Sequence, residues 1–153
     1  MDFYTEYFKG KNDKIYNVFI SHSWTYNDSE YEKIVEWLDD SDIAWKDYSV
    51  PQNDPIHTNG SDKELYEAIK NKISPSTIIL MMGNVASSYS KWIDKEIEIS
   101  KEVFDKKILG INSNGTHTTD KQTSKKVADA ADKIVGWTSK SIIDAIKELC
   151  EEE

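Results

Sequence analysis

The chain has 153 residues, the usual size of one domain with a single hydrophobic core. An apolar share of 38% and a charged share of 31% exclude disorder throughout. The net charge of -9 repels phosphate backbones, and no basic stripe reverses it, so we expect one soluble domain that does not bind nucleic acid.

The two ends of the chain are expected to lie outside this domain. Residues 1–13 are polar with scattered aromatics and are predicted to form an N-terminal arm, while residues 151–153 form an acidic tail. The predicted domain is the segment 14–150. The sequence has neither a signal-peptide pattern nor a run of about 18 apolar residues, so we expect no membrane span. The single cysteine, Cys150, is expected on a solvated helix and fits a cytoplasmic location.

Strand and helix patterns alternate in the first half of the domain. Residues 16–21 predict a buried strand, and an amphipathic helix with apolar residues at helical spacing follows it. Residues 43–48 predict a second strand. The segment 49–61 contains two prolines and a glycine, which indicates a long loop, and a helix begins after it near Asp62.

The second half starts with the most continuous apolar run in the chain. Residues 77–82 are all apolar or β-branched, as expected for a central strand covered on both faces, and Gly83 ends the run. The polar segment 112–125 is predicted to be a loop. The remaining predicted elements are a helix over 87–104, strands over 107–111 and 133–136, and a final helix over 139–149.

This alternation predicts the fold class. Strands joined by helices form parallel sheets through right-handed crossovers. We therefore expect an α/β protein, a single flavodoxin-like three-layer domain with a central parallel sheet of about five strands. Ligands in such sheets bind beyond the carboxyl ends of the strands, which directs attention to residues 21–27, 47–60, 82–90 and the loop after Ile111.

Glu96 interrupts an apolar row of the helix predicted over 87–104. Ile99 and Val103 belong to the same row, and Trp92 lies one turn before Glu96 on that face. A carboxylate in a half-buried apolar stripe is costly unless it is satisfied, and such placements are enriched at functional sites. The alternative is that Glu96 reaches the rim and pairs with Lys91.

Polar side chains also follow the first two predicted strands. Asp47 is a candidate for holding a ribose hydroxyl beside Ser49, or alternatively it caps the backbone of the loop. The segment after the first strand contains Ser21, His22, Ser23 and Trp24. Its hydroxyl groups and backbone amides can bind a phosphate or a ribose, and the indole of Trp24 can stack on a base. The alternative is that this segment is only a polar turn that caps the next helix.

Two other kinds of site are not supported by the sequence. His22 stands between two serines, but no G-x-S-x-G turn is present and sequence adjacency does not create triad geometry. His57 and His117 have no companion ligands at metal spacing, so no metal site is predicted.

Two other classes of protein with this fold fit the sequence poorly. A phosphoacceptor receiver domain would need acidic residues after the first strand, where this chain has Ser-His-Ser. A flavodoxin would need a glycine in the loop after that strand.

Three segments carry a family resemblance: NVFISHSW at 17–24, STIILMMG at 76–83 and SKWIDKEIEIS at 90–100. They resemble the TIR-like family, in the subgroup that includes the ThsB component of the Thoeris antiphage system. The resemblance covers roughly residues 14–111. In that family the glutamate of a W-x-x-x-E-I pattern on this helix is the catalytic residue of NAD cleavage. Trp92, Glu96 and Ile97 match that pattern here.

The resemblance implies an activity and a set of site residues. Glu96 would catalyse cleavage of the bond between nicotinamide and ribose, with NAD or a related nucleotide as the substrate and no separate cofactor. The product would be an ADP-ribose nucleotide, linear or cyclised, that signals to an effector protein in antiphage defence. The residues expected around the substrate are Ser21, His22, Ser23, Trp24, Asp47, Ser49, Gly83 and Trp92.

The resemblance also leaves an alternative open. TIR-type sites are often completed between neighbouring subunits, which implies self-association. Some family members are non-catalytic scaffolds, and a fold alone does not settle a function. A TIR-like interaction module therefore stays the alternative to an enzyme.

Overall fold

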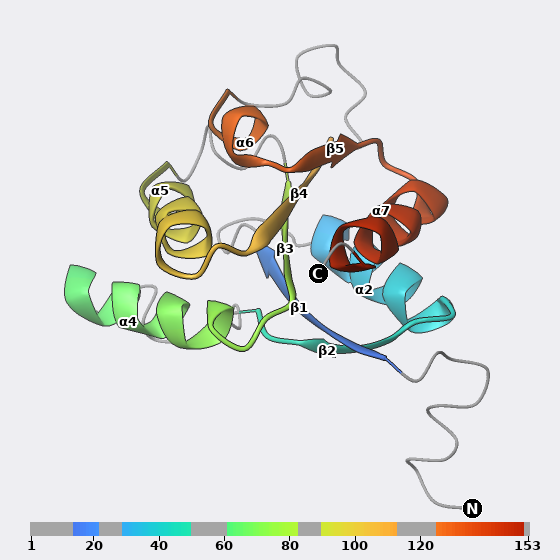
Figure 1. Ribbon diagram of the computed structural model, residues 1–153, viewed down its shortest axis with the longest axis horizontal. Helices are drawn as coiled ribbons and strands as arrows, with labels where there is room; N and C mark the ends of the chain where they lie inside the picture. Colours follow the sequence, from blue (N-terminus) through green and yellow to red (C-terminus); the bar gives the residue numbers. More distant parts are fainter. Residues whose placement is uncertain (1–13, 22–28, 50–60, 83–89, 113–124, 152–153) are drawn as a thin grey trace, which may run out of the picture.

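Five parallel strands form one sheet in the order β2-β1-β3-β4-β5 (Figure 1). The structure is a computed structural model that describes residues 14–21, 29–49, 61–82, 90–112 and 125–151. This strand order is the flavodoxin-like one, so the predicted fold class is confirmed. The strands are β1 (Ile15–Ser21), β2 (Ala44–Asp47), β3 (Ile78–Met82), β4 (Lys107–Ile111) and β5 (Lys133–Val135).

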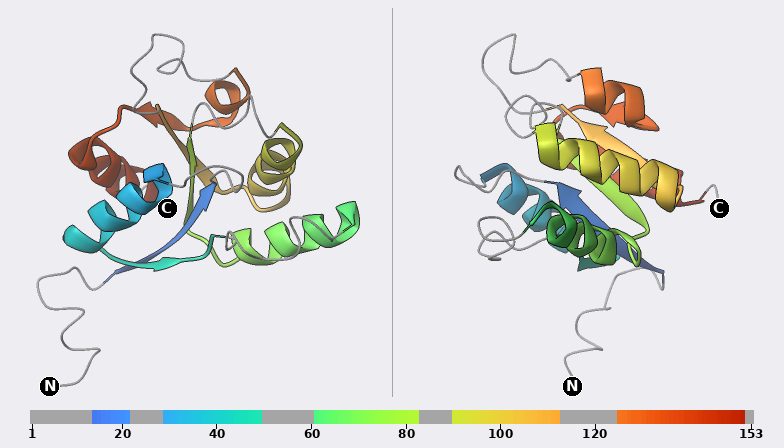
Figure 2. Two further views of the ribbon diagram at one scale, coloured as in Figure 1. Left: turned by 180° about the vertical axis from the view of Figure 1, so that it is seen from behind. Right: turned by 90° about the vertical axis from the view of Figure 1, so that its left-hand side faces the viewer.

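Helices cover both faces of this sheet (Figures 1 and 2). One face packs against α2 (Ser29–Asp40) and α7 (Ser139–Glu151). The opposite face packs against α4 (Asp62–Ile73), α5 (Ser90–Glu98), the π-helix η2 (Ile99–Val103) and α6 (Lys125–Ala130). The start of α4 agrees with the prediction, because the Ser61 side chain accepts a hydrogen bond from the backbone N–H of Glu64, 3.2 Å away.

The central strand β3 explains why its sequence is apolar without alternation. Ile78, Leu80 and Met82 point to the core under α2 and α7, whereas Ile79 and Met81 point to the core under α4 and α5. All five residues are buried. Because neither face of the strand meets water, neither needs polar side chains.

The end of the predicted helix 87–104 differs from the expectation. The α-helix α5 ends at Glu98 and continues as η2, where the N–H of Phe104 donates to the carbonyl of Ile99 over 3.1 Å, five residues back. The wider turn rotates the following residues, so Phe104 packs against the core and Val103 is 42% exposed. The predicted apolar row through Val103 was therefore wrong at its last member.

Two further expectations are corrected. Residues 125–130 form α6, where Val127 is buried, whereas the sequence predicts a polar loop through Lys125 and no helix after it. Cys150 is buried rather than solvated, because it continues the inner face of α7 one turn after Ile146. No helix within the described ranges has the length and apolarity to cross a membrane.

Candidate functional site

Ser21 and Glu96 meet at the carboxyl edge of the sheet. Ser21 is the last residue of β1, and its hydroxyl donates to Oε1 of Glu96 on α5 over 2.8 Å. Both residues are buried, with 2% and 1% of their surfaces exposed. The structure thus brings together two of the predicted site residues that stand 75 positions apart in the sequence.

Strand and helix periodicity explain why these side chains face each other. Along β1, Phe19 belongs to the core under α4 and α5, and Ser21 lies two residues later on the same face. On α5, Ile93 and Ile99 are fully buried and Glu96 lies between them on the inner stripe. A polar pair therefore replaces apolar contacts where the sheet ends.

Burial controls the charge of the Glu96 carboxyl. Removal from water raises its pKa to about 8 from the ordinary 4.5, although the hydrogen bond from Ser21 lowers the pKa in part. The group is therefore mainly protonated at neutral pH. Its second oxygen, Oε2, has no hydrogen-bond partner among the described residues. A buried oxygen without a partner is uncommon and calls for a ligand or a neighbouring group.

The end of β2 is connected to the same edge. The Ser49 hydroxyl accepts a hydrogen bond from the backbone N–H of Ile20 over 2.9 Å, next to Ser21. It thereby extends the β1–β2 ladder, in which the N–H of Tyr48 donates to the carbonyl of Val18 over 2.8 Å. The Ser49 hydroxyl keeps a hydrogen that it can donate, so its predicted role in substrate binding stays a prediction.

Asp47 makes the capping contact that was the alternative to ribose binding. Its Oδ1 accepts from the backbone N–H of Ser49 over 2.9 Å, and its Oδ2 accepts from the Tyr31 hydroxyl of α2. Sequence reasoning did not identify Tyr31 as a partner of Asp47, because the two residues belong to different elements. These contacts hold Asp47 at the strand end, where ribose binding by its carboxylate stays a prediction.

The remaining predicted residues cannot be placed at this site from the structure. His22, Ser23, Trp24 and Gly83 lie outside the described residues, as do His57 and His117. Trp92 lies on α5 one turn before Glu96, and only its backbone is described.

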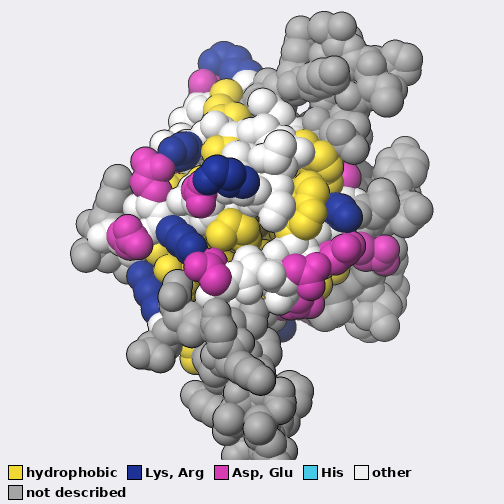
Figure 3. Space-filling model, turned by 90° about the vertical axis from the view of Figure 1, so that its right-hand side faces the viewer, with side chains coloured by type: hydrophobic (Ala, Val, Ile, Leu, Met, Phe, Trp, Pro, Cys, Tyr) yellow, Lys and Arg dark blue, Asp and Glu magenta, His cyan; other side chains and the backbone are white. Residues whose placement is uncertain are grey.

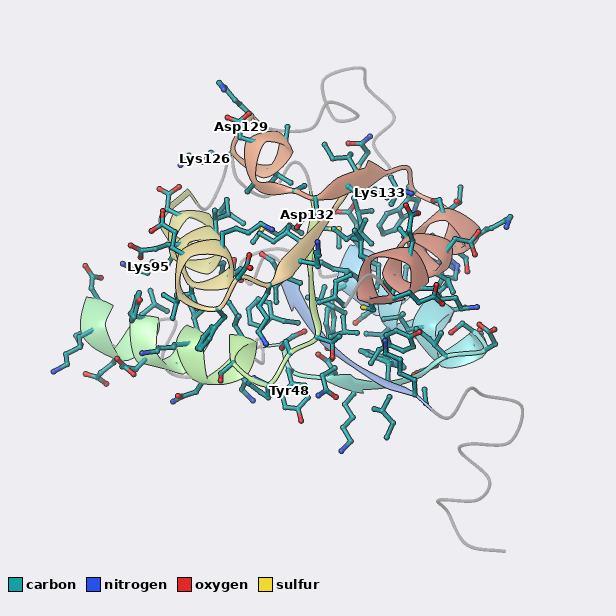
Figure 4. The ribbon with its side chains drawn as sticks, viewed as in Figure 1. Tyr48, Lys95, Lys126, Asp129, Asp132 and Lys133 are labelled. Atoms are coloured by element: carbon teal, nitrogen blue, oxygen red, sulfur yellow. The ribbon has the colours of Figure 1, made fainter. Side chains whose placement is uncertain are left out.

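Hydrogen bonds and an ion pair of Asp132 attach η2, which continues α5, to the sheet. Asp132, marked in Figure 4, accepts from the backbone N–H of Ile108 over 2.8 Å and from the ammonium group of Lys101 on η2. Lys101 also donates to the carbonyl of Lys106 over 3.0 Å. Burial raises the pKa of Asp132, but these donors outweigh it and the net pKa is lowered.

The outer side of α5 and the surface over α2 and α7 carry mainly charged, solvent-exposed side chains. A shallow depression on the outer side of α5 is lined by acidic side chains together with Lys95 and Ile97. On the α2 and α7 side, lysines and acidic residues are interspersed with apolar side chains (Figure 3). Lys147 of α7 forms an ion pair over 2.8 Å with Asp42, which lies in the turn between α2 and β2.

Comparison with known families decides what kind of domain this is. The family model for the Thoeris protein ThsB, TIR-like domain, matches residues 19–118. The chain belongs to this family. The matched range contains the Ser21–Glu96 pair and the end of β2, and the resemblance predicted from the three sequence segments is confirmed.

Other comparisons add little to this family assignment. A crystal structure of type II dehydroquinase from Propionibacterium acnes aligns with a TM-score of 0.47 and 12% identity, over 92% of this chain and 99% of that one. No curated protein matches this TIR-like chain.

Proposed function

We propose that this ThsB-family protein cleaves NAD at the bond between nicotinamide and ribose. The product is an ADP-ribose nucleotide, linear or cyclic, that signals to an effector protein in antiphage defence. One observation carries the proposal: a buried carboxyl at the carboxyl edge of the sheet, held on one oxygen by Ser21 and left without a described partner on the other.

The chemistry of this bond requires what Glu96 can supply. As the glycosidic C–N bond breaks, its electron pair goes to the nicotinamide nitrogen and positive charge develops on the ribose. A carboxylate beside the ribose stabilises that charge and accepts hydrogen bonds from the ribose hydroxyls. Nicotinamide leaves as a neutral molecule, because its ring is already cationic in NAD, so no strong general acid is needed. The oxygen of water, or of another hydroxyl of the same nucleotide, then forms a bond to the cationic carbon of the ribose and loses its proton to solvent.

The protonation of Glu96 fits this scheme. In the free protein the carboxyl is mainly neutral at pH 7, since its pKa is raised to about 8 by burial. A cationic ring placed close to a carboxyl favours the ionised form. NAD would therefore create the carboxylate by binding next to it. With 1% of its surface exposed, Glu96 meets a ribose only after binding moves the groups that cover it.

Nicotinamide release from NAD tests the proposal directly. Concentrated protein is incubated with NAD, and nicotinamide is followed by chromatography for the native chain and for Glu96→Gln, which keeps the shape of the side chain and removes its acid. Glu98→Gln is the matched control, because Glu98 lies on the same helix and is exposed. We expect release by the native protein and by Glu98→Gln and none above background by Glu96→Gln. The mass of the second product identifies the acceptor.

Two outcomes would contradict the proposal. Equal release by the native protein and Glu96→Gln would remove Glu96 from the reaction. Silence of all three proteins, even with a crowding agent that favours assembly, would favour the non-catalytic interaction module. The crowding agent matters because our proposal includes TIR-type self-association that completes the site.

A further inference from the structure

A second buried hydroxyl lies one helical turn beyond Glu96. Ser100 is in η2, has 0% of its surface exposed, and its Oγ has no hydrogen-bond partner in the described part of the chain. Ser100 follows Glu96 by four residues, about one helical turn, so both side chains project from the buried side of the segment formed by α5 and η2. Among the described residues, Oγ of Ser100 and Oε2 of Glu96 are the two buried side-chain polar atoms that have no hydrogen-bond partner.

The hydroxyl of Ser100 is not used by its own helix. A serine inside a helix usually donates to the carbonyl four residues earlier or points to solvent. Ser100 does neither within the described structure, although its carbonyl accepts from the N–H of Lys106 over 2.6 Å. Its carbonyl is therefore engaged while its Oγ has no partner, and a buried polar atom without a hydrogen bond is costly.

A hydroxyl can form a hydrogen bond with a carboxyl group in both its protonated and its ionised form. It accepts a hydrogen bond from the neutral acid and donates one to the carboxylate, by rotation of a single bond. The other oxygen of Glu96 already faces a hydroxyl, that of Ser21. A carboxylate offers about four acceptor positions, so two serines leave room for the hydroxyls of a ribose.

We propose that Ser100 is a positioning residue for Glu96, whose hydroxyl pairs with the Oε2 side of the carboxyl and, together with Ser21, holds it in both its neutral and its ionised form. The pairing forms by a change of rotamer or through a single water molecule. The catalytic consequence rests on the proposed function, in which Glu96 acts on NAD.

Charged neighbours do not provide this control in the described structure. The pKa of Glu96 is raised by burial and lowered by Ser21, and these are the two causes of its shift. On α5 and η2, Glu98 and Glu102 are exposed, and the ammonium group of Lys101 is engaged by Asp132. Among the described residues, the hydroxyl of Ser21 is thus the group that counteracts the effect of burial on the pKa of Glu96.

The test measures the ionisation of Glu96 without requiring NAD cleavage. Protein labelled with carbon-13 at the glutamate carboxyls is titrated by NMR, and the Glu96 signal is assigned by its absence in Glu96→Gln. The variants are Ser100→Ala, which removes the hydroxyl, and Ser100→Cys, which keeps the volume and donates weakly. Ser76→Ala is the matched control, because Ser76 is also buried but donates to the carbonyl of Lys72 over 2.8 Å.

We expect the titration midpoint of Glu96 to rise by about 0.5–1 pH unit in Ser100→Ala, since a hydrogen bond to the carboxylate is stronger than one with the neutral acid and its loss disfavours the ionised form. A smaller rise is expected in Ser100→Cys and none in Ser76→Ala. An unchanged or lowered midpoint in Ser100→Ala would overturn the proposal. If that variant does not fold, as judged by circular dichroism, the midpoint of Ser100→Cys decides in the same way.

The kinetic readout separates this inference from the proposed function. If the native protein releases nicotinamide, the pH profile of kcat should move with the NMR midpoint in Ser100→Ala while KM changes little. If the native protein is silent and the NMR midpoint still moves, the assigned activity fails and the role of Ser100 stands. If release is normal and neither the profile nor the midpoint moves, the activity stands and the role of Ser100 fails.

Discussion

The hydroxyl of Ser21 donates to the carboxyl of Glu96 across 2.8 Å, joining the end of the first strand to the inner face of α5 beneath the protein surface. A single hydrogen bond thus connects the sheet edge, where ligands of this fold class bind, to the group that our proposal makes catalytic. The pair also couples folding to pH, because burial of an acid changes its affinity for a proton.

Replacing Glu96 by glutamine should change how stability depends on pH. The pKa of Glu96 is raised to about 8 in the folded protein from the ordinary 4.5, so the folded state holds the proton more tightly than the unfolded state. The contribution of Glu96 to stability is therefore fully present below about pH 4.5 and is lost as the pH rises towards 8. Each pKa unit is worth about 1.4 kcal/mol, so the loss between about pH 5 and 9 is on the order of 4 kcal/mol.

Urea denaturation at several pH values checks this expectation. Glu96→Gln lacks the titrating group and should lose less stability than the native chain as pH rises, whereas Glu98→Gln should follow the native curve. Parallel curves for the native protein and Glu96→Gln would show that burial does not hold the proton on Glu96.

Removing the hydroxyl of Ser21 should raise the pKa of Glu96 further. The hydrogen bond from Ser21 is what lowers that pKa, so Ser21→Ala leaves burial unopposed and Oε1 without its donor. We expect a loss of about 1–3 kcal/mol in the free energy of unfolding and a higher titration midpoint by NMR. Ser76→Ala should also cost stability but leave the midpoint unchanged, and a midpoint unmoved in Ser21→Ala would contradict the pairing.

Strong local patterns made most of the fold predictable. The continuous apolar residues of β3 could only suit a strand covered on both faces, and strand–helix alternation led to the parallel sheet. Glu96 was identified because a carboxylate breaks an apolar row. The serine that pairs with it could be placed at the same edge by the sheet rule, but the bond itself joins residues 75 positions apart and needed the structure.

The π-helix could not be predicted from the sequence. Val103 and Phe104 are both apolar, so helical spacing gave no reason to prefer either for the core. The wider turn selects Phe104 and leaves Val103 exposed. The short helix α6 could not be predicted for a different reason, since it is six residues long and Val127 is its one buried residue.

Gly110 on β4 is expected to be intolerant of a side chain. A Cβ atom there would lie 3.2 Å from Cγ1 of Val127 and 3.3 Å from both Cβ of Ala131 and Cγ1 of Ile134. Three side chains would have to move together, which typically costs about 1–3 kcal/mol. Thermal unfolding of Gly110→Ala should show a clearly lower Tm. Gly136→Ala is the control, because an added Cβ meets nothing within 4 Å there, and equal Tm values would mean that α6 shifts freely.

Binding of NAD should release a proton from Glu96. With a pKa of about 8, the carboxyl is mostly protonated at pH 7 in the free protein, and the cationic nicotinamide ring favours its ionised form. Calorimetric titration with an uncleavable carbocyclic NAD analogue, in two buffers of different ionisation enthalpy, measures the protons released. We expect nearly one proton per bound ligand at pH 7, and progressively fewer above pH 8, where the carboxyl is already ionised.

Glu96→Gln separates this proton from those of other groups that titrate on binding. The variant has no acid at this position, so the proton count should fall by nearly one while binding itself is retained. An equal proton count in the native protein and the variant would mean that the cationic ring does not lie beside Glu96. Cleavage by a carboxylate that NAD binding creates next to the ribose would then lose its physical basis, even if NAD binds elsewhere on this edge of the sheet.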